Sequence, residues 1–255
     1  QSLVGDVSLL TEDGQILAQA REIRVQRFSP SATTRLDSYE EWLYALDWRR
    51  RSHLPPASAS VGAAAGAWVV LTDRGGTGAA LASLLRSQGE ICVCIAHGER
   101  NARIAPDHYE VNPVDLTAFN AAIQWALAQH PLYRGVVHLW SLDATAPDAT
   151  TVETLHADQH LSSLSALALV QAILRKRARD TPRLWLLTRG AQPLSIEAAQ
   201  LAVASAPLWG LGRTLALEHP ELGCSRVDLC PALTAQESAT MLCNELFSND
   251  GEDQI

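Results

Sequence analysis

Residues 68–85 read WVVLTDRGGTGAALASLL, and this stretch decides the fold. It opens with the apolar run Trp68–Leu71, passes through the glycine-rich segment TDRGGTG at 72–78, and continues as a helix-like run from Ala79 to Leu85. A strand, a glycine-rich turn and a helix in this order can hold a dinucleotide pyrophosphate on backbone amides. The stretch therefore raises the hypothesis of a nicotinamide cofactor site.

From Trp68 onward, short apolar runs alternate with helix-length segments. Strands are predicted at 68–72, 90–96, 108–111, 135–139, 183–188 and 225–229, and helices at 78–88, 115–129, 151–178, 195–218 and 234–247. Asp115 and Ser195 are suited to cap two of the helices, and Pro220 ends the fourth. This alternation predicts an α/β fold with a doubly wound parallel sheet.

Residues 1–28 differ from the rest because they are β-rich with no helical pattern. The segment Thr11–Gly14 contains Asp-Gly between two apolar stretches, which predicts a hairpin, and residues 23–28 alternate as a half-buried strand does. So short a segment cannot bury a core alone. We expect it to be the tail of a larger β domain or to pack on the residues after it. Residues 29–38 are polar and read as a linker, 43–48 as a strand, and 49–67 as a surface loop.

Composition restricts the classes of partner. The 255-residue chain has a formal net charge of −8, and it carries a basic run at Arg175–Arg177. Nucleic-acid surfaces need clustered Lys and Arg, whereas this run falls late in a predicted helix, where cations complement the dipole. No apolar run reaches the roughly 20 residues that span a bilayer, and no secretory signal is present. We expect no nucleic acid, no membrane and a cytoplasmic location.

Cysteine and histidine offer little prospect of a metal site. Five cysteines without framework spacing fit a reducing compartment, and Cys92 and Cys94 are predicted to be buried thiols on one strand. Nothing in the spacing favours a tetrahedral zinc site from these two with His97 and His108. His156 and His160 lie one helical turn apart but have no apparent third ligand. We therefore predict no metal.

The glycine loop departs from a working dinucleotide fingerprint. Short-chain reductases usually carry Thr-Gly-x-x-x-Gly-x-Gly, but here Asp73 follows Thr72, and the spacing to Gly76 and Gly78 is one residue short. A carboxylate close to a diphosphate repels it by ~1 kcal/mol or more. The structural alternative to a cofactor site is a tight strand-to-helix turn. Because of the two departures, we predict that the degenerate loop Asp73, Gly75, Gly76 and Gly78 binds no cofactor.

Catalytic residues are missing as well. A short-chain reductase needs a Tyr to protonate the carbonyl and a Lys four residues later to lower the pKa of that Tyr. The single lysine, Lys176, has Ala172 four residues before it, and none of the four tyrosines has Lys or Arg at that offset. There is also no Gly-x-Ser-x-Gly and no His-Glu-x-x-His. We predict no catalytic residues in this chain.

The stretch LWGLGRTLALEHP at 208–220 places Gly210 and Gly212 inside a helix-like segment. Each glycine costs roughly 1 kcal/mol relative to alanine, so something must compensate. Close backbone packing against a sheet or a partner domain is the favoured reason, and room for a ligand is the alternative.

Together these residues resemble the ketoreductase region of modular polyketide synthases, and more narrowly its N-terminal structural subdomain. Four features occur in order: the strand LYALDW at 43–48, the degenerate turn after 68–71, the highly specific stretch 208–220, and the ending DGEDQI at 250–255. The resemblance covers residues 39–255. Residues 1–28 resemble, less specifically, the last strands of the dehydratase (hot-dog) domain that precedes it, whose catalytic His and Asp would lie upstream.

The resemblance implies a truncated Rossmann-like, short-chain-reductase-like fold that binds no NADPH and packs against a following catalytic subdomain of the same polypeptide. NADPH would bind in that partner, which reduces β-ketoacyl groups carried by acyl carrier protein. An adjacent dehydratase or enoylreductase domain is a further implied neighbour. Overlaid on a catalytic subdomain, Ala206 falls near the Tyr position, Gly210 four residues on, and Thr188 near the end of the strand leading to the catalytic Ser.

Three functions compete. The first, which we favour, is a noncatalytic scaffold for the catalytic subdomain. The second is an active NADPH-dependent ketoreductase with a divergent site, which rests on Gly75, Gly76 and Gly78. The third is a docking or dimerisation module between domains, motivated by the basic run 49–51 and the apolar strand before it.

Overall fold

A computed structural model describes residues 2–11, 13–26, 48–50, 66–175, 181–193, 201–248 and 251–255. The chain divides into two compact units, Gln1–Arg50 and Arg51–Ile255. The predicted linker 29–38, the predicted strand 43–48 apart from Trp48, and the proposed cap Ser195 lie outside the described residues.

The first unit contains the predicted hairpin. Strands β1 (Ser2–Leu10) and β2 (Ile16–Gln26) pair antiparallel, and Gly14 in the turn has a φ of 84°, a conformation that favours glycine. The alternating stretch that begins at Ile23 continues β2 instead of forming a separate strand. A bulge makes this possible: Glu22 has a φ of 57°, and its N–H donates to the Asp6 carboxylate at 2.8 Å.

Apolar side chains of the hairpin are exposed within the described residues. Val7 pairs with Ala20 and Leu9 with Ala18, so both pairs lie on one face, and Val7 and Leu9 are each 61% exposed. A two-stranded hairpin is at best marginally stable alone. That this hairpin belongs to a larger β domain therefore stays a prediction.

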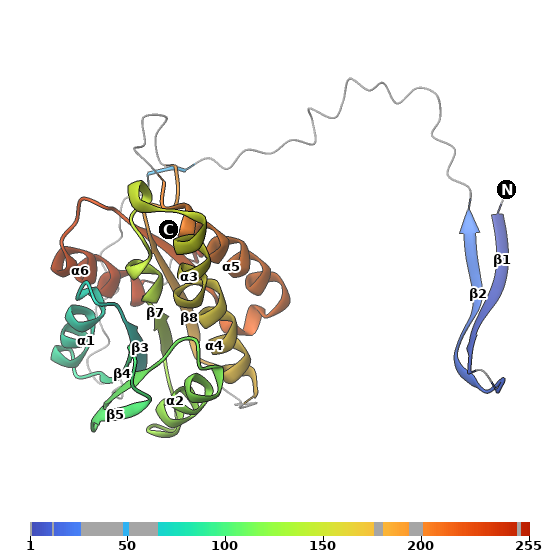
Figure 1. Cartoon of the computed structure of the whole chain (residues 1–255), viewed down its shortest axis with the longest axis horizontal. Coiled ribbons are helices and arrows are strands. Elements are labelled where there is room, and N and C mark those ends of the chain that lie inside the picture. Colours follow the sequence, from blue (N-terminus) through green and yellow to red (C-terminus); the bar gives the residue numbers. More distant parts are fainter. Residues whose placement is uncertain are drawn as a thin grey trace, which may run out of the picture. The chain divides into compact units, whose positions relative to one another are not determined.

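The second unit is built on a seven-stranded sheet (Figure 1). Its strands are β3 (Ala67–Thr72), β4 (Ile91–His97), β5 (Ala102–Ala105), β6 (His108–Val111), β7 (Gly135–His138), β8 (Arg183–Arg189) and β9 (Ser225–Leu229), in the order β5-β6-β4-β3-β7-β8-β9. All pairs are parallel except β5 with β6. This order is that of a doubly wound sheet, and the predicted α/β fold is confirmed. The sequence reading missed β5, a short and largely exposed edge strand.

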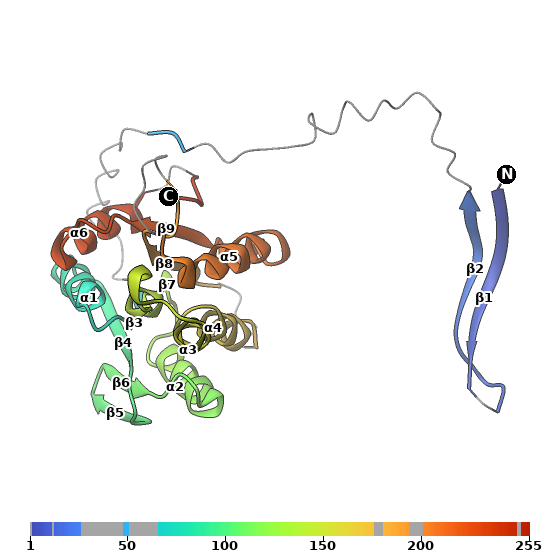
Figure 2. The same ribbon diagram turned by 45° about the horizontal axis from the view of Figure 1, so that its top comes forward.

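Helices cover both faces of the sheet (Figure 2). One face packs on α1 (Thr77–Ser87) and α6 (Ala235–Leu246), and the other on α2 (Leu116–Ala128), α4 (Ser163–Arg175) and α5 (Ala206–Glu218), with α3 (Val152–Leu161) preceding α4. Short 3₁₀ turns occupy Trp140–Asp143, Pro147–Ala149, Val203–Ser205 and Pro220–Leu222. No helix in the described ranges is long and apolar enough to cross a membrane.

Two predicted helices differ from those observed. The helix predicted over 151–178 breaks at Ser162 into α3 and α4, because the φ of −108° and ψ of −95° at Ser162 are not helical; its N–H and its hydroxyl both donate to the Asp158 carbonyl at 3.0 Å. The helix predicted to start at 195 begins at Ala206, where Pro207 suits the first turn and would break a helix interior. The cap at Asp115 is confirmed, since its side chain accepts the N–H of Ala118 at 2.9 Å.

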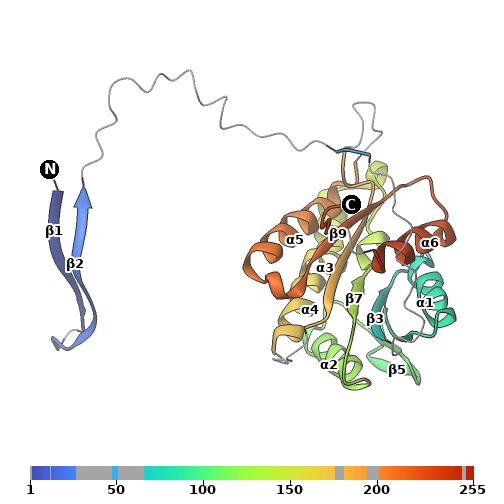
Figure 3. The ribbon, with the colours of Figure 1, turned by 180° about the vertical axis from the view of Figure 1, so that it is seen from behind.

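The C-terminal residues lie beside β9 (Figure 3). The N–H of Arg226 donates to the carbonyl of Asp253 at 2.8 Å, and the N–H of Ile255 returns a bond to Arg226 at 2.9 Å. The Arg226 guanidinium is 2% exposed, donates to the Gly212 carbonyl at 2.7 Å and pairs with the Asp253 carboxylate. A buried charge needs such a partner, so this pair fixes the tail against the sheet edge.

Gly212 confirms the close-packing interpretation. A Cβ at this position would lie 2.6 Å from Cδ of Arg226 and 3.3 Å from Leu186. At Gly210, by contrast, no atom lies within 4 Å of a Cβ. Gly210 lies on the exposed side of α5, so its packing against a partner stays a prediction.

The two glycines should therefore respond oppositely to alanine. We expect Gly212→Ala to lower the free energy of unfolding by about 1–3 kcal/mol, because the new methyl group displaces the buried Arg226 stem. Gly210→Ala should raise it by up to about 1 kcal/mol through helix propensity. Urea denaturation followed by circular dichroism measures both. Equal midpoints for Gly212→Ala and the unsubstituted chain would contradict the packing assignment.

Candidate functional site

The glycine-rich loop keeps the geometry of a strand-to-helix turn. β3 ends at Thr72 and α1 begins at Thr77, after Gly76 with a φ of 90°. A Cβ on Gly78 would lie 2.9 Å from the Cα of Thr72, so helix and strand approach closely here. The tight turn expected from the sequence is confirmed, and these glycines serve backbone geometry whether or not a ligand binds.

Asp73 occupies the amide cluster at the start of α1. Its side chain is buried, with one carboxylate oxygen 2.6 Å from the N–H nitrogen of Gly78 and the other 3.2 Å from that of Thr77. The first N–H groups of a helix have no intrahelical partner and form a ready anion site. The chain thus supplies its own anion where a phosphate would bind.

A second carboxylate, from Asp143, bridges the ends of three strands. Asp143 follows β7, and its two oxygens accept the N–H of Arg74 after β3 at 3.0 and 2.8 Å. The same side chain meets Nε2 of His97, the last residue of β4, at 2.6 Å. The side chains of His97 and Asp143 are 4% and 12% exposed. This contact was not foreseen; the only signal for it is an acidic residue shortly after a strand.

Beside this bridge, a shallow hollow of about 520 Å³ is lined by Arg74, His97, Gly98, Glu99, Arg100 and Glu110. Arg100 is not available as a simple anion ligand, because its guanidinium pairs with Glu110 at 3.2 Å. The pKa of the Glu110 carboxyl is lowered by hydrogen bonds from Arg100. The hollow therefore carries both signs of charge.

At the strand ends where a reductase holds its catalytic residues, the structure places a different network. The Thr188 hydroxyl donates to the carboxylate of Asp228 at 2.7 Å and accepts the indole N–H of Trp209 at 2.8 Å. Asp228 also accepts the N–H groups of Ala191 and Gln192, each at 3.0 Å. Ala206 begins α5, and neither it nor Gly210 carries a group that could transfer a proton.

His138 is a buried histidine that sequence reasoning did not single out. Its Nε2 lies 2.7 Å from the Ser165 hydroxyl, which itself donates to the Ser162 carbonyl. Because that hydroxyl has one hydrogen to give, Nε2 carries the ring proton. Burial lowers the pKa of His138 to about 3. The ring is neutral and sealed from solvent, and it has no access to a ligand.

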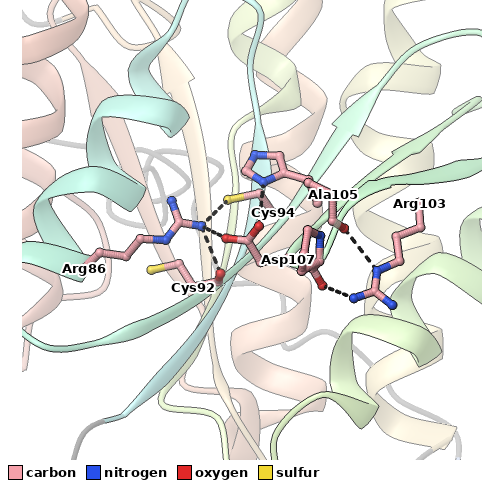
Figure 4. Close-up of polar contacts among 8 residues, drawn as sticks. Arg86, Cys92, Cys94, Arg103, Ala105 and Asp107 are labelled. Carbon is pink, nitrogen blue, oxygen red and sulfur yellow. Dashed lines mark hydrogen bonds and ion pairs between the residues drawn. The ribbon is translucent and has the colours of Figure 1, made fainter.

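The cysteine cluster is structural (Figure 4). Cys92 and Cys94 are buried as predicted, and burial raises the pKa of the Cys92 thiol to about 12. Arg86, near the end of α1, donates to the Cys92 carbonyl at 3.1 Å and to the Asp107 carboxylate at 2.6 Å. Arg103 donates to the Ala105 and Pro106 carbonyls in the same turn. These contacts join α1 to the β5–β6 hairpin.

Metal ligands do not gather in the described part of the chain. His156 and His160 both lie on α3, and His108 meets Asp107 at 3.3 Å. Among the residues that the structure describes, no three His, Cys, Asp or Glu side chains are placed to hold an ion.

The chain has an α/β Rossmann-like fold of the short-chain-reductase type, with a short N-terminal hairpin. The family model for the Rossmann fold domain of the polyketide synthase extender module SpnB matches residues 46–243, and the chain belongs to this family. It is a ketoreductase-like domain of a modular polyketide synthase.

Curated relatives are much longer than this chain. It is 28% identical over 230 residues to a phenolphthiocerol/phthiocerol polyketide synthase polypeptide of Mycobacterium tuberculosis, covering 88% of this chain and 12% of that protein. It is 29% identical over 222 residues to the pikromycin polyketide synthase component PikAII of Streptomyces venezuelae, covering 85% of this chain and 5% of that one. The chain thus spans about an eighth or less of these two proteins.

Solved structures agree on the fold. A C2-type ketoreductase from a modular polyketide synthase superposes with a TM-score of 0.57 at 25% identity, covering 82% of this chain and 39% of that one. A multidomain structure with adenylation, ketoreductase and pseudo-Asub domains, from a keto acid-selecting NRPS module, gives 0.67 at 19% identity, covering 79% and 16%.

The buried His138 predicts a pH dependence of stability. The unfolded chain takes up a proton on this side chain near pH 6.5, whereas the folded chain does so only near pH 3. The free energy of unfolding should therefore fall as pH drops below about 6.5, by roughly 1 kcal/mol per pH unit from this group. His138→Gln retains an N–H for Ser165 without titrating.

Urea denaturation at a series of pH values measures this effect. We expect a smaller loss of stability between pH 6.5 and 5 for His138→Gln than for the unsubstituted chain. His156→Gln, at an exposed position on α3, is the matched control and should leave the pH dependence unchanged. Parallel pH profiles for all three chains would show that His138 does not titrate as its burial requires.

Proposed function

We propose that this chain is a noncatalytic structural subdomain that packs against and stabilises the NADPH-dependent catalytic subdomain of a polyketide synthase ketoreductase. The single observation that carries the proposal is the position of Asp73. Its carboxylate accepts the N–H groups of Thr77 and Gly78, where a dinucleotide-binding fold offers these amides to phosphate.

Asp143 strengthens this argument. A pyrophosphate entering the crevice would have to displace Asp143 from the N–H of Arg74 and would leave His97 without its carboxylate partner. It would also meet two negative side chains at close range, where like charges repel. Both effects weigh against NADPH, and they concern the same loop.

The chain also lacks the catalytic residues of a short-chain reductase. No Tyr in the sequence is followed by Lys at the required offset, and the overlay positions hold Ala206 and Gly210. Thr188, near the position that leads to the catalytic Ser, has its hydroxyl engaged by Trp209 and Asp228. A cofactor bound here would lack the Tyr and Lys pair that a short-chain reductase uses. The match to only 39% of a solved ketoreductase is in keeping with one part of a larger region.

The outer surface of α4 and α5 supplies a face for the proposed partner. These helices contact each other, and they expose Leu164 and Leu167 on α4 and Leu217 on α5, the last being 85% exposed. Gly210 lies two helical turns before Leu217 on the exposed side of α5 and leaves room for close approach. We propose that these apolar side chains meet the catalytic subdomain.

NADPH titration tests the proposal directly. We expect no heat of binding by isothermal titration calorimetry at ~1 mM NADPH, a concentration that reveals any micromolar Kd. Asp73→Gly alone should not restore binding, because Asp143 still holds the Arg74 amide. Circular dichroism confirms that each chain is folded. Micromolar binding by the unsubstituted chain would sink the proposal and favour the divergent-reductase alternative.

A surface substitution tests the partner. We expect Leu217→Asp to weaken association with the separately expressed catalytic subdomain at least tenfold, because it places a charge in an apolar contact. Met241→Asp on α6 is the matched control: Met241 is 49% exposed on the opposite layer and should not matter. Analytical ultracentrifugation measures both. Equal losses of affinity in the two variants would place the contact elsewhere. If the chain does not bind the catalytic subdomain but self-associates, and Leu217→Asp abolishes that self-association, a homodimeric docking module is favoured.

A further inference from the structure

A second cavity lies at the carboxyl ends of β7, β8 and β9. It has a volume of about 630 Å³, within the range of small-molecule sites. Its walls are largely apolar and include Leu142, Pro147, Leu201, Leu229 and Pro231. Neither Asp73 nor any other residue of the glycine loop lines it, so the carboxylates that fill the phosphate position leave this cavity open.

The charged groups in the wall make hydrogen bonds within the chain. Asp228 accepts one hydroxyl and two backbone N–H groups. The Arg189 guanidinium donates to the Leu233 carbonyl at 3.1 Å and to the hydroxyls of Thr77 and Ser238 at 3.3 and 3.5 Å. Binding an ion in the cavity would require breaking these bonds or desolvating a charge beside them. The cavity therefore disfavours charged ligands.

Gln192 supplies a neutral polar side chain that can bind a ligand. This residue lines the cavity, is half-buried, and its side-chain amide makes no hydrogen bond to the described residues. An amide both donates and accepts, so it can bind a hydroxyl, a carbonyl or another amide. The hydroxyls of Ser141, Thr145 and Ser205 also line the cavity, but each donates to a group of this chain. A largely apolar wall with one neutral amide not bonded within the described residues favours a ligand of the same pattern.

We propose that this cavity is a binding site for an uncharged amphiphile, a molecule with an apolar body and one hydrogen-bonding group. The apolar body lies on the leucine and proline wall, and the polar group bonds Gln192. The site needs no dinucleotide and no catalytic residue of this chain.

Cys230 provides a reporter for this site. It lines the cavity and is exposed, whereas the other four cysteines are buried. Burial also raises the pKa values of the Cys92, Cys94, Cys224 and Cys243 thiols, which makes them slow to alkylate. Iodoacetamide should therefore label Cys230 first, and a molecule in the cavity should slow that reaction.

The experiment compares three molecules of one shape: hexan-1-ol, hexanoate and hexylamine. We expect hexan-1-ol to slow alkylation of Cys230, by about threefold when its concentration is twice its Kd, with little effect from the two charged compounds. Ala202→Phe and, separately, Ala146→Phe place a ring in the cavity and should abolish the protection. Met241→Phe on α6 is the control of equal bulk. Circular dichroism selects folded variants.

The results separate this inference from the proposed function. No protection by hexan-1-ol, equal protection by all three compounds, or protection that survives in a folded cavity-filling variant would overturn the amphiphile site. NADPH, run as a fourth arm, should give no protection. If NADPH protects Cys230 and hexan-1-ol does not, both proposals fail; if only hexan-1-ol protects, both stand.

Discussion

The unpaired N–H groups at the start of α1 are the constraint on which the rest of the site depends. A helix that begins in a buried turn must find acceptors for these groups, and in a nucleotide-binding fold a phosphate is the usual one. Here Asp73 supplies the acceptor from within the chain. The strand, turn and helix are therefore complete without a ligand, and Gly78 allows the close approach of α1 to β3.

The same solution recurs along the carboxyl edge of the sheet. Asp143 accepts the N–H of Arg74, and Asp228 accepts those of Ala191 and Gln192. Each carboxylate follows or ends a strand and takes backbone donors that would otherwise face the crevice. Asp73 and Asp143 thus take the amides beside β3, whereas the largely apolar cavity over β7 to β9, with Asp228 in its wall, stays open. A fold can lose its phosphate-binding amides in this way and keep a neighbouring cavity.

Local pattern was sufficient for six strands of the sheet, for the bounds of α1, α2 and α6, and for the doubt that Asp73 could lie beside a phosphate, because these depend on neighbours in sequence; the exposed edge strand β5 was missed. The Asp143 bridge joins residues 69 apart, and no local rule links Arg74 to that carboxylate. The break at Ser162 could not be predicted, because serine also occurs inside helices and its ψ of −95° has no marker in the sequence. Gly212 could be suspected from its cost, but its reason, the stem of a buried arginine from β9, required the tertiary structure.

The tail beside β9 bears on how this domain can be joined to others. The backbone of Asp253 and Ile255 bonds to β9, Gln254 forms an isolated bridge with Arg226, and Asp253 is the charged partner of that buried arginine. A chimera spliced between α6 and the tail would leave the buried Arg226 without its carboxylate partner, even though the splice falls between recognisable elements. Module engineering should therefore treat the tail as inseparable from the Rossmann unit and place its junctions after Ile255.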